Sequence, residues 1–243
     1  MSKYVASDIH GLKERYDAMI QCLNLQEDDT LYILGDVVDR GPDGIAILQD
    51  IMKRKNIVML LGNHEYMMKQ YYDAQRGKID DQEEVYIIQD RWYRNHCVPT
   101  INEFEKLSLE EQDIILNFLD TLPLAICDLK AGDNLYYLSH GSVSKQFTSG
   151  VVYQRDVLGS EVTIEDFVWN RMVIDDPVFN DRCIIVGHTP TLFYQDNKPY
   201  AVYANTDDIK TASIIDIDCG CAVNNQDTRL GVVCLDDRTC MYF

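Results

Sequence analysis

Four of the five histidines in this 243-residue sequence stand in the same kind of place. Each lies beside a glycine or an asparagine, just after a short apolar run that is typical of a β-strand. These histidines are His10, His64, His140 and His188. Acidic and amide side chains in the same loops are Asp8, Asp36, Asp39 and Asn63. A mixture of imidazole, carboxylate and amide oxygen suits Mn²⁺, Fe or Zn²⁺ better than Ca²⁺ or Mg²⁺, so the residues predict a transition-metal site.

The number of candidate ligands predicts more than one ion. A single tetrahedral zinc uses four ligands, fewer than the sequence offers. Two divalent ions about 3.5–4 Å apart, sharing one bridging carboxylate, would use the whole set. We therefore expect a binuclear centre.

A repeated pattern in the first 65 residues is expected to bring these side chains together. Three times, a short apolar run leads to a polar loop and then to a helix-like segment; the runs are 4–6, 31–34 and 57–61, with helices expected at 12–23 and 44–53. This order is typical of parallel strands joined by helices. The loops that follow parallel strands meet at one edge of a sheet, where ligands bind.

The rest of the chain predicts a helical insertion and a second group of strands. Residues 66–122 are charged and helix-rich, and Ser108 with Glu111 forms a capping box ahead of an amphipathic helix. Strand-like runs return at 135–138 and 183–186, before the loops of His140 and His188. The closing runs 213–217, 231–235 and 239–243 are spaced like an antiparallel meander. We expect one α/β domain over residues 1–243, with two packed mixed β-sheets flanked by helices and an insertion at about 66–122.

The charge balance argues against two classes of partner. With 40 acidic against 22 basic residues, the formal net charge is −18, which repels nucleic acids and anionic membranes. The N-terminal residues lack the basic and apolar regions of a signal peptide, and no apolar run is long enough to span a membrane. We expect a cytoplasmic protein with no nucleic-acid or membrane partner.

Five sequence blocks in order carry a family resemblance. They are Asp-Ile-His-Gly at 8–11, Gly-Asp-Val-Val-Asp-Arg-Gly at 35–41, Gly-Asn-His-Glu at 62–65, and the loops of His140 and His188. The sequence resembles the calcineurin-like metallophosphoesterases, and within them the phosphoprotein phosphatase branch that includes bacterial and bacteriophage serine/threonine phosphatases. One departure is Ser7, where the family usually has glycine before the aspartate. The resemblance implies the four-layer metallophosphoesterase fold.

The resemblance also implies the roles of the metal ligands. Asp36 would bridge two divalent ions, manganese in the first place with iron or zinc as alternatives. The remaining ligands would be Asp8 and His10 on one ion, and Asn63, His140 and His188 on the other. A hydroxide that bridges both ions would attack phosphorus in line with the leaving oxygen, without a covalent intermediate.

Catalytic and substrate-binding residues follow from the same resemblance. His64 would be the general acid that protonates the leaving group, oriented by Asp39. Arg40 would bind two phosphate oxygens in a bidentate manner. Arg171, in Trp-Asn-Arg at 169–171, is the expected second phosphate-binding arginine, with Arg155 as the competitor and Arg182 as a weaker one.

The function expected from the resemblance is hydrolysis of phosphomonoesters, with a phosphorylated protein or peptide as substrate and small phosphoesters as further substrates. The alternative is a hydrolase of dinucleoside polyphosphates such as diadenosine tetraphosphate. That branch typically lacks the aspartate found here as Asp39, and often has aspartate where this chain has Glu65, so both residues favour a serine/threonine protein phosphatase. A catalytically inactive scaffold is a minor alternative, because none of the expected ligands is missing.

Overall fold

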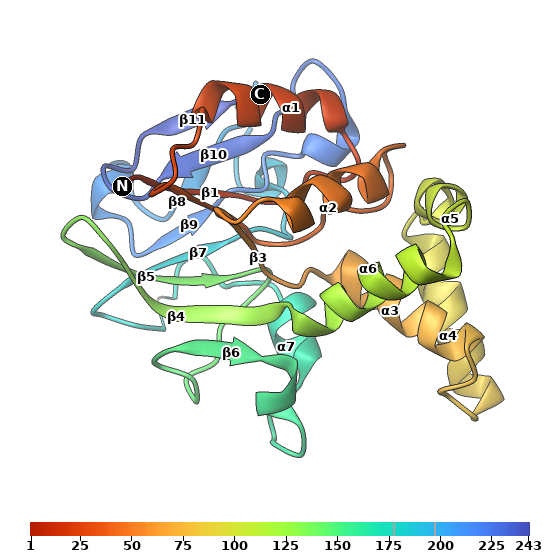
Figure 1. The fold of residues 1–243 in the computed structure, drawn as a ribbon. Coiled ribbons are helices and arrows are strands. Elements are labelled where there is room, and N and C mark those ends of the chain that lie inside the picture. Colours follow the sequence, from red (N-terminus) through yellow and green to blue (C-terminus); the bar gives the residue numbers. More distant parts are fainter. Residues whose placement is uncertain (177, 197) are drawn as a thin grey trace.

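Two β-sheets pack face to face in the computed structural model, which describes residues 1–176, 178–196 and 198–243 (Figure 1). The first sheet has the order β11-β10-β1-β2-β3 and the second the order β6-β4-β5-β7-β9-β8. The first comprises β1 (Lys3–Ala6), β2 (Thr30–Ile33), β3 (Ile57–Met59), β10 (Gly231–Cys234) and β11 (Cys240–Tyr242). The second comprises β4 (Pro123–Ala131), β5 (Asn134–Ser139), β6 (Val151–Tyr153), β7 (Cys183–Val186), β8 (Tyr203–Ala204) and β9 (Ile214–Asp216).

Alternation along the strands divides the apolar side chains between two cores. Val5 of β1 lies with Tyr136 and Ile185 of the second sheet in the core between the sheets. Its neighbour Ala6 belongs instead to the larger core under the helices. Successive side chains of a strand point to opposite faces, so a strand buried on both faces reads as a continuous apolar run.

Helices cover the outer faces of both sheets. Strands β1, β2 and β3 are parallel, and α1 (Lys13–Leu23) and α2 (Gly44–Lys53) connect them across the outer face of the first sheet (Figure 1). The short helix α7 (Ile164–Val168) lies beside the second sheet. The predicted α/β architecture of two mixed sheets flanked by helices is confirmed, and the expected helices at 12–23 and 44–53 agree with α1 and α2 to within one residue.

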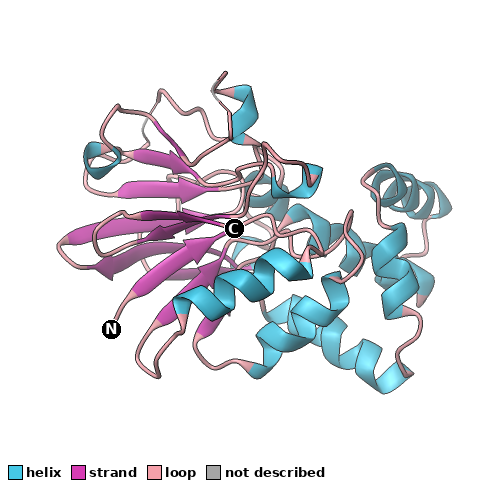
Figure 2. Ribbon diagram, turned by 90° about the horizontal axis from the view of Figure 1, so that it is seen from above, coloured by secondary structure: helices cyan, strands magenta, loops and turns pink. Residues whose placement is uncertain are grey.

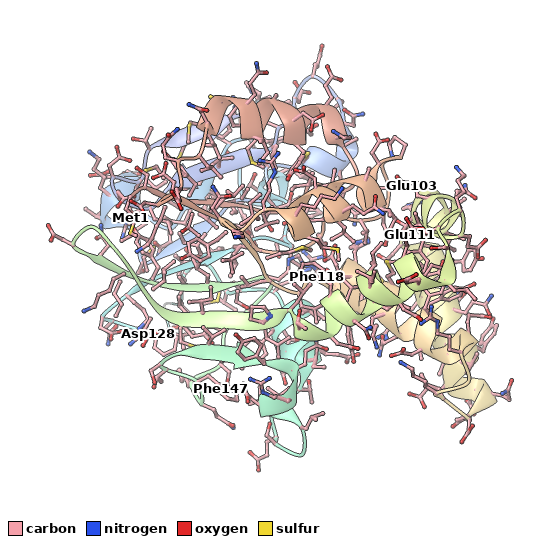
Figure 3. All side chains as sticks on the ribbon, in the orientation of Figure 1. Met1, Glu103, Glu111, Phe118, Asp128 and Phe147 are labelled. Carbon is pink, nitrogen blue, oxygen red and sulfur yellow. The ribbon has the colours of Figure 1, made fainter. Side chains whose placement is uncertain are left out.

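The helical insertion predicted at about 66–122 contains most of α3 (Asn63–Gln75) and all of α4 (Gln82–Arg94), α5 (Val98–Phe104) and α6 (Leu109–Thr121). Figure 2 shows these helices gathered beyond one end of the strands. Ser108 and Glu111 form the predicted capping box at the start of α6. On α5, Glu103 (labelled in Figure 3) accepts a hydrogen bond from the backbone N–H of Ile45 at 3.0 Å, which ties the insertion to α2.

The predicted C-terminal meander is wrong. Strand β9 pairs with β7 and β8 in the second sheet, whereas β10 and β11 form a hairpin at the edge of β1 in the first sheet. The chain crosses between the sheets over residues 217–230. Apolar runs do not specify which sheet a strand joins, because both sheets bury the same kinds of side chain. The single-domain organisation stays a prediction.

No helix within the described residues is long and apolar enough to cross a membrane.

Candidate metal and phosphate site

The predicted metal ligands converge at the carboxyl ends of the strands. Their loops follow β1, β2, β3, β5 and β7, so both sheets contribute. Two groups of side chains place their ligand atoms within 4.8 Å of one another: His10, Asp36 and His64 in one, and Asp36, His140 and His188 in the other. Asp36 belongs to both groups, which is the position that a bridging carboxylate requires. We call this set the floor of the site, and it consists of the buried Asp8, His10, Asp36, Asn63, His64 and His140 with the partly buried His188.

Three of the floor histidines are oriented by backbone carbonyl groups. A carbonyl oxygen only accepts, so the ring nitrogen facing it must carry a proton, and the other ring nitrogen is the one directed at the site, where it can bind a metal ion once it carries no proton. This is the usual arrangement of metal-binding histidines. The pairs are His10 Nδ1 with Val38 O at 3.0 Å, His140 Nδ1 with Leu34 O at 2.8 Å, and His188 Nε2 with Trp169 O at 3.2 Å.

His64 has a different partner. Its Nδ1 lies 2.6 Å from Oδ2 of Asp39, and its Nε2 lies 3.3 Å from Nη2 of Arg40. Burial lowers the pKa of His64, but the charge of Asp36 and the hydrogen bond with Asp39 outweigh it, so the pKa is raised above its ordinary value. A carboxylate-supported imidazole beside an arginine has the features of a proton donor to a phosphoester, as the sequence predicts.

Asp36 occupies the centre of the floor. Its carboxylate lies 3.6 Å from Nε2 of His10 and 3.3 Å from Nε2 of His140, and it accepts the backbone N–H of His64 at 3.0 Å. Burial raises the pKa of Asp36, but the neighbouring histidines, His140 first, hold it well below its ordinary value. The amide of Asn63 lies beside the same ring, with Oδ1 2.9 Å from Nε2 of His140.

Buried negative charge at this end of the molecule exceeds buried positive charge. The buried carboxylates near the floor are Asp8, Asp36, Asp39, Glu65, Asp216 and Asp218. The one buried arginine in the described part of the chain, Arg238, donates instead to Tyr136 and to backbone carbonyls far from the floor. Against the effect of burial, the charge of Asp36 raises the pKa of His140 to about 9. The donor set and its surplus of charge fit divalent cations, which when bound would activate water and offset the charge of a phosphate.

Strained backbone accompanies the floor. Ten residues other than glycine have a positive φ among those described, and six of them are predicted site residues. These six are Asp8 (57°), His10 (50°), Asp36 (55°), Asp39 (70°), Arg40 (67°) and His188 (65°). Such conformations cost of order 1–3 kcal/mol each and cluster at functional sites, where the surrounding structure holds them.

Glu65 holds two of these loops in place. Its fully buried carboxylate accepts the backbone N–H groups of Asp36 at 2.8 Å, Val37 at 2.8 Å, Val38 at 3.1 Å and Gly62 at 3.2 Å. Burial, with the charge of Asp36, raises the pKa of Glu65 to about 7. Gly62 must lack a side chain, because a Cβ there would lie 2.3 Å from Oδ1 of Asp36. The loop at 62–65 therefore positions Asp36 as well as supplying Asn63 and His64.

More exposed side chains line the site beside the floor, and we call them the rim: the exposed Arg40, Arg171 and Phe193 with the partly buried Trp169. With the floor they line a cleft of about 160 Å³. Arg171 lines this cleft together with Arg40, with Nη1 3.5 Å from the backbone oxygen of His188. Arg155 lies in a separate hollow beside Tyr153, and Arg182 is bound to backbone oxygens of residues 127 and 148. The structure brings Arg171 to the site and leaves both competitors away from it.

Two carboxylates of the site are absent from the sequence prediction. Asp216 ends β9 and Asp218 follows it; both are buried, and Asp218 lines the cleft with Asp8 and Arg40. Burial and neighbouring carboxylates raise the pKa of both well above the ordinary value. A signal was present, since a mainly apolar run at 214–217 leads to a loop with Asp218 and Gly220, and the loops after β1 and β2 also place aspartate and glycine just after an apolar run.

The sequence profile of the calcineurin-like phosphoesterases matches residues 1–213. The chain belongs to this family. The expected resemblance to calcineurin-like metallophosphoesterases is therefore confirmed, whereas the individual roles of the site residues stay predictions.

The curated proteins that this sequence resembles include symmetrical bis(5'-nucleosyl)-tetraphosphatases. A symmetrical bis(5'-nucleosyl)-tetraphosphatase of Wigglesworthia glossinidia brevipalpis is 30% identical over 125 residues, which are 47% of this chain and 46% of that protein. One of Pectobacterium carotovorum is 34% identical over 84 residues, 33% of this chain and 30% of that protein. The matched region thus spans about half or less of these curated relatives.

Solved structures extend the fold comparison over the whole chain. A serine/threonine phosphatase of Saccharomyces cerevisiae superposes with a TM-score of 0.57 at 14% identity, covering 100% of this chain and 79% of that one. A metallophosphoesterase of Sphaerobacter thermophilus gives 0.54 at 16% identity, covering 100% and 86%. At these identities the likeness concerns the fold alone, and the fold is that of metallophosphoesterases.

Proposed function

We propose that this phosphoesterase hydrolyses dinucleoside polyphosphates, with diadenosine tetraphosphate as the first substrate to test. Water would add to an inner phosphorus and the central anhydride bond would break, giving two nucleoside diphosphates. The observation that carries the proposal is the sequence similarity to symmetrical tetraphosphatases, which reaches 30% identity over 125 residues in one of them. Asp39 and Glu65 led us to expect a phosphoprotein substrate first and a dinucleoside polyphosphate second. The similarity to tetraphosphatases favours the opposite order.

The rim supports a substrate that combines phosphates with aromatic bases. Arg40 and Arg171 lie on the same cleft and offer two guanidinium groups to successive phosphates. Phe193, 68% exposed, and Trp169 line the same cleft, and aromatic rings of this kind stack on bases. A neighbouring hollow of about 500 Å³ shares Arg40 and Asn95 with the cleft, so a long substrate could extend past Arg40.

The protein's own residues would act in three ways. Arg40 and Arg171 would hold phosphate oxygens and orient the reacting phosphorus. His64 would give a proton to the departing oxygen, with Asp39 keeping its ring in place. His10, His140 and His188, with Asp8, Asp36 and Asn63, would hold two divalent ions, for which we propose manganese first and iron or zinc as alternatives.

A second candidate function is dephosphorylation of phosphoserine or phosphothreonine in proteins. The observation that favours it is the 2.6 Å contact between His64 and Asp39. A serine alkoxide is strongly basic and departs only with a proton, whereas a nucleoside diphosphate is a much weaker base and needs less help. An acid supported by its own buried carboxylate suits the more demanding leaving group.

A direct comparison of kcat/KM tests the proposal. The full chain with added Mn²⁺ is assayed on diadenosine tetraphosphate and on a phosphoserine peptide, and nucleotide products are separated by chromatography. We expect a higher kcat/KM for the dinucleotide, with ADP as the sole product. A preference for the phosphopeptide would overturn the first proposal and establish the second, and ATP with AMP as products would exclude symmetrical cleavage.

The Phe193→Ala variant probes the expected base stacking. Stacking on an aromatic side chain contributes about 1–3 kcal/mol per base, so kcat/KM for the dinucleotide should fall about 10-fold or more. Hydrolysis of p-nitrophenyl phosphate, which has no base, serves as the control and should be unchanged. Equal rates of the variant and the native chain on the dinucleotide would remove Phe193 from the proposed base site.

A further inference from the structure

Asp39, the carboxylate that orients His64, is itself held by the helical insertion. It is fully buried, and its Oδ2 accepts both the imidazole of His64 at 2.6 Å and the indole N–H of Trp92 at 2.8 Å. Its Oδ1 accepts the hydroxyl of Thr100 at 2.6 Å. Trp92 lies on α4 and Thr100 on α5, so two helices of the insertion reach one catalytic carboxylate.

The backbone around Asp39 is held by the same segment. The backbone N–H of Asp39 donates to Oγ1 of Thr100 at 2.8 Å, and the N–H of Arg40 donates to the carbonyl oxygen of His96 at 3.1 Å. Asp39 and Arg40 both have positive φ, so these contacts fix a conformation that their side chains disfavour. The insertion thus controls the backbone and the side chain of Asp39 together.

Trp92 is fixed by its surroundings. It is fully buried in an aromatic cluster within the insertion, with its ring 4.9 Å from that of Tyr71 and 5.9 Å from that of Tyr72. A packed indole cannot turn away from Asp39 without disturbing this cluster. The direction of its N–H is therefore determined by the packing of the insertion.

We propose that Trp92 and Thr100 are positioning residues for the general acid, and that the helical insertion sets the orientation of His64 through Asp39. With both carboxylate oxygens held by donors, Oδ2 faces Nδ1 of His64 and keeps Nε2 directed at the leaving oxygen. The proposal rests on the acid role assigned to His64 under the proposed function. It gives the insertion a role in proton transfer as well as in packing.

The dependence of the rate on the leaving group distinguishes two roles of Trp92. In one it positions His64 through Asp39, and in the other it only stabilises the buried charge of Asp39. Trp92→Phe keeps an aromatic ring and removes the N–H. We expect kcat to fall about 10-fold for a phenyl phosphate, whose leaving group needs a proton, and less than about 3-fold for p-nitrophenyl phosphate. Equal losses on both esters, or no loss on either, would overturn the proposal.

A matched control comes from the same aromatic cluster. Tyr72 is buried beside Trp92, and its hydroxyl has no hydrogen-bond partner among the described residues. Tyr72→Phe should leave the ratio of the two rates unchanged. If it altered the ratio as much as Trp92→Phe, packing rather than the contact with Asp39 would be responsible, and the proposal would fail.

The threonine gives a second test should Trp92→Phe fold poorly. Thr100→Ser keeps the hydroxyl and should retain the native rate ratio, whereas Thr100→Val removes the hydroxyl at nearly constant shape and should lower the rate on phenyl phosphate selectively. A double variant tests whether Trp92 acts through His64. In a chain that already carries His64→Asn, adding Trp92→Phe should not change the ratio of the rates on phenyl phosphate and p-nitrophenyl phosphate any further. Additive losses would contradict action through His64.

A spectroscopic readout separates this proposal from the proposed function. The chain has two tryptophans, so ¹⁵N-labelled tryptophan gives two indole signals, assigned with Trp169→Phe. Asp39→Asn should shift the signal of Trp92 and leave that of Trp169 in place; no shift would refute the contact. Failure to hydrolyse the dinucleotide would refute the substrate assignment only, because this test and the aryl phosphate assays do not use it.

Discussion

The floor and the rim of the site are held in different ways. Floor side chains are buried, apart from the partly buried His188, and each histidine has one ring nitrogen fixed by a backbone carbonyl or by Asp39. On the rim, Arg40, Arg171 and Phe193 are exposed, and Arg171 makes only a long contact with a backbone oxygen, at 3.5 Å. The floor is therefore preorganised before a substrate arrives, whereas the exposed side chains of Arg171 and Phe193 can adjust when a substrate binds.

This difference indicates where chemistry and specificity reside. A preorganised, buried set stabilises charge without reorganisation, which is the larger contribution to rate. Exposed side chains that become ordered on binding lose conformational entropy and contribute less to affinity. Changes to the floor should therefore abolish turnover, and changes to the rim should mainly redirect it.

The largest effect is expected for Asp36→Asn at the centre of the floor. Loss of the shared carboxylate should lower kcat by about 10³-fold or more and weaken Mn²⁺ binding, measured by calorimetry. Asp113→Asn, at an exposed position on α6, is the control and should change neither. Near-normal turnover of Asp36→Asn would remove the floor from catalysis.

A loss of about 10²–10⁴-fold is expected for His64→Asn on an alkyl phosphate, because the leaving alkoxide then departs without a proton donor. The loss should be much smaller on p-nitrophenyl phosphate, whose leaving group is a weak base. Steady-state rates on the two substrates give the measurement. Equal losses would exclude His64 as the acid.

A smaller effect, on stability, is expected for Glu65→Gln. The amide keeps one acceptor oxygen and turns an N–H₂ group toward backbone donors of Asp36, Val37 or Val38, so the free energy of unfolding should fall by about 2 kcal/mol. Urea denaturation of the native and variant chains measures it. Glu110→Gln, at an exposed position on α6, should change stability by less than about 0.5 kcal/mol.

The smallest effect is expected on the rim. Arg171→Lys replaces a bidentate group by a point charge, and KM should rise about 10-fold with kcat little changed. Arg155→Lys is the matched control, since that side chain lies over the ring of Tyr153 outside the cleft. A rise in KM for the Arg155 variant instead would reassign the second phosphate-binding residue.

Sequence reasoning located the floor because its residues lie in short motifs directly after strands. Parallel strands bring such loops to one edge, so local spacing predicts that the loops of Asp8, Asp36 and Asn63 meet, whereas the place of His140 in the same site followed from the family resemblance. The two-sheet architecture followed from the order of apolar runs.

Contacts between distant segments were not accessible in the same way. Trp92 lies in the stretch 66–122 that the sequence predicts to be helix-rich, and nothing in its spacing indicates that its N–H faces Asp39. Asp218 was missed because the strand before it was assigned to a meander, and the pattern of apolar residues does not specify the sheet. Arg171 and Arg155 were both candidates for the second phosphate-binding arginine, and only their positions in the structure distinguish them.

The placement of β1 has a consequence for the order of folding. Its two neighbours are β2 and β10, and Tyr4 pairs with Cys234 in the antiparallel ladder. The loop that carries Asp8 and His10 thus depends on a strand synthesised near the end of this chain. During synthesis one edge of β1 stays unpaired, which exposes a strand to aggregation and delays formation of the site until β10 arrives.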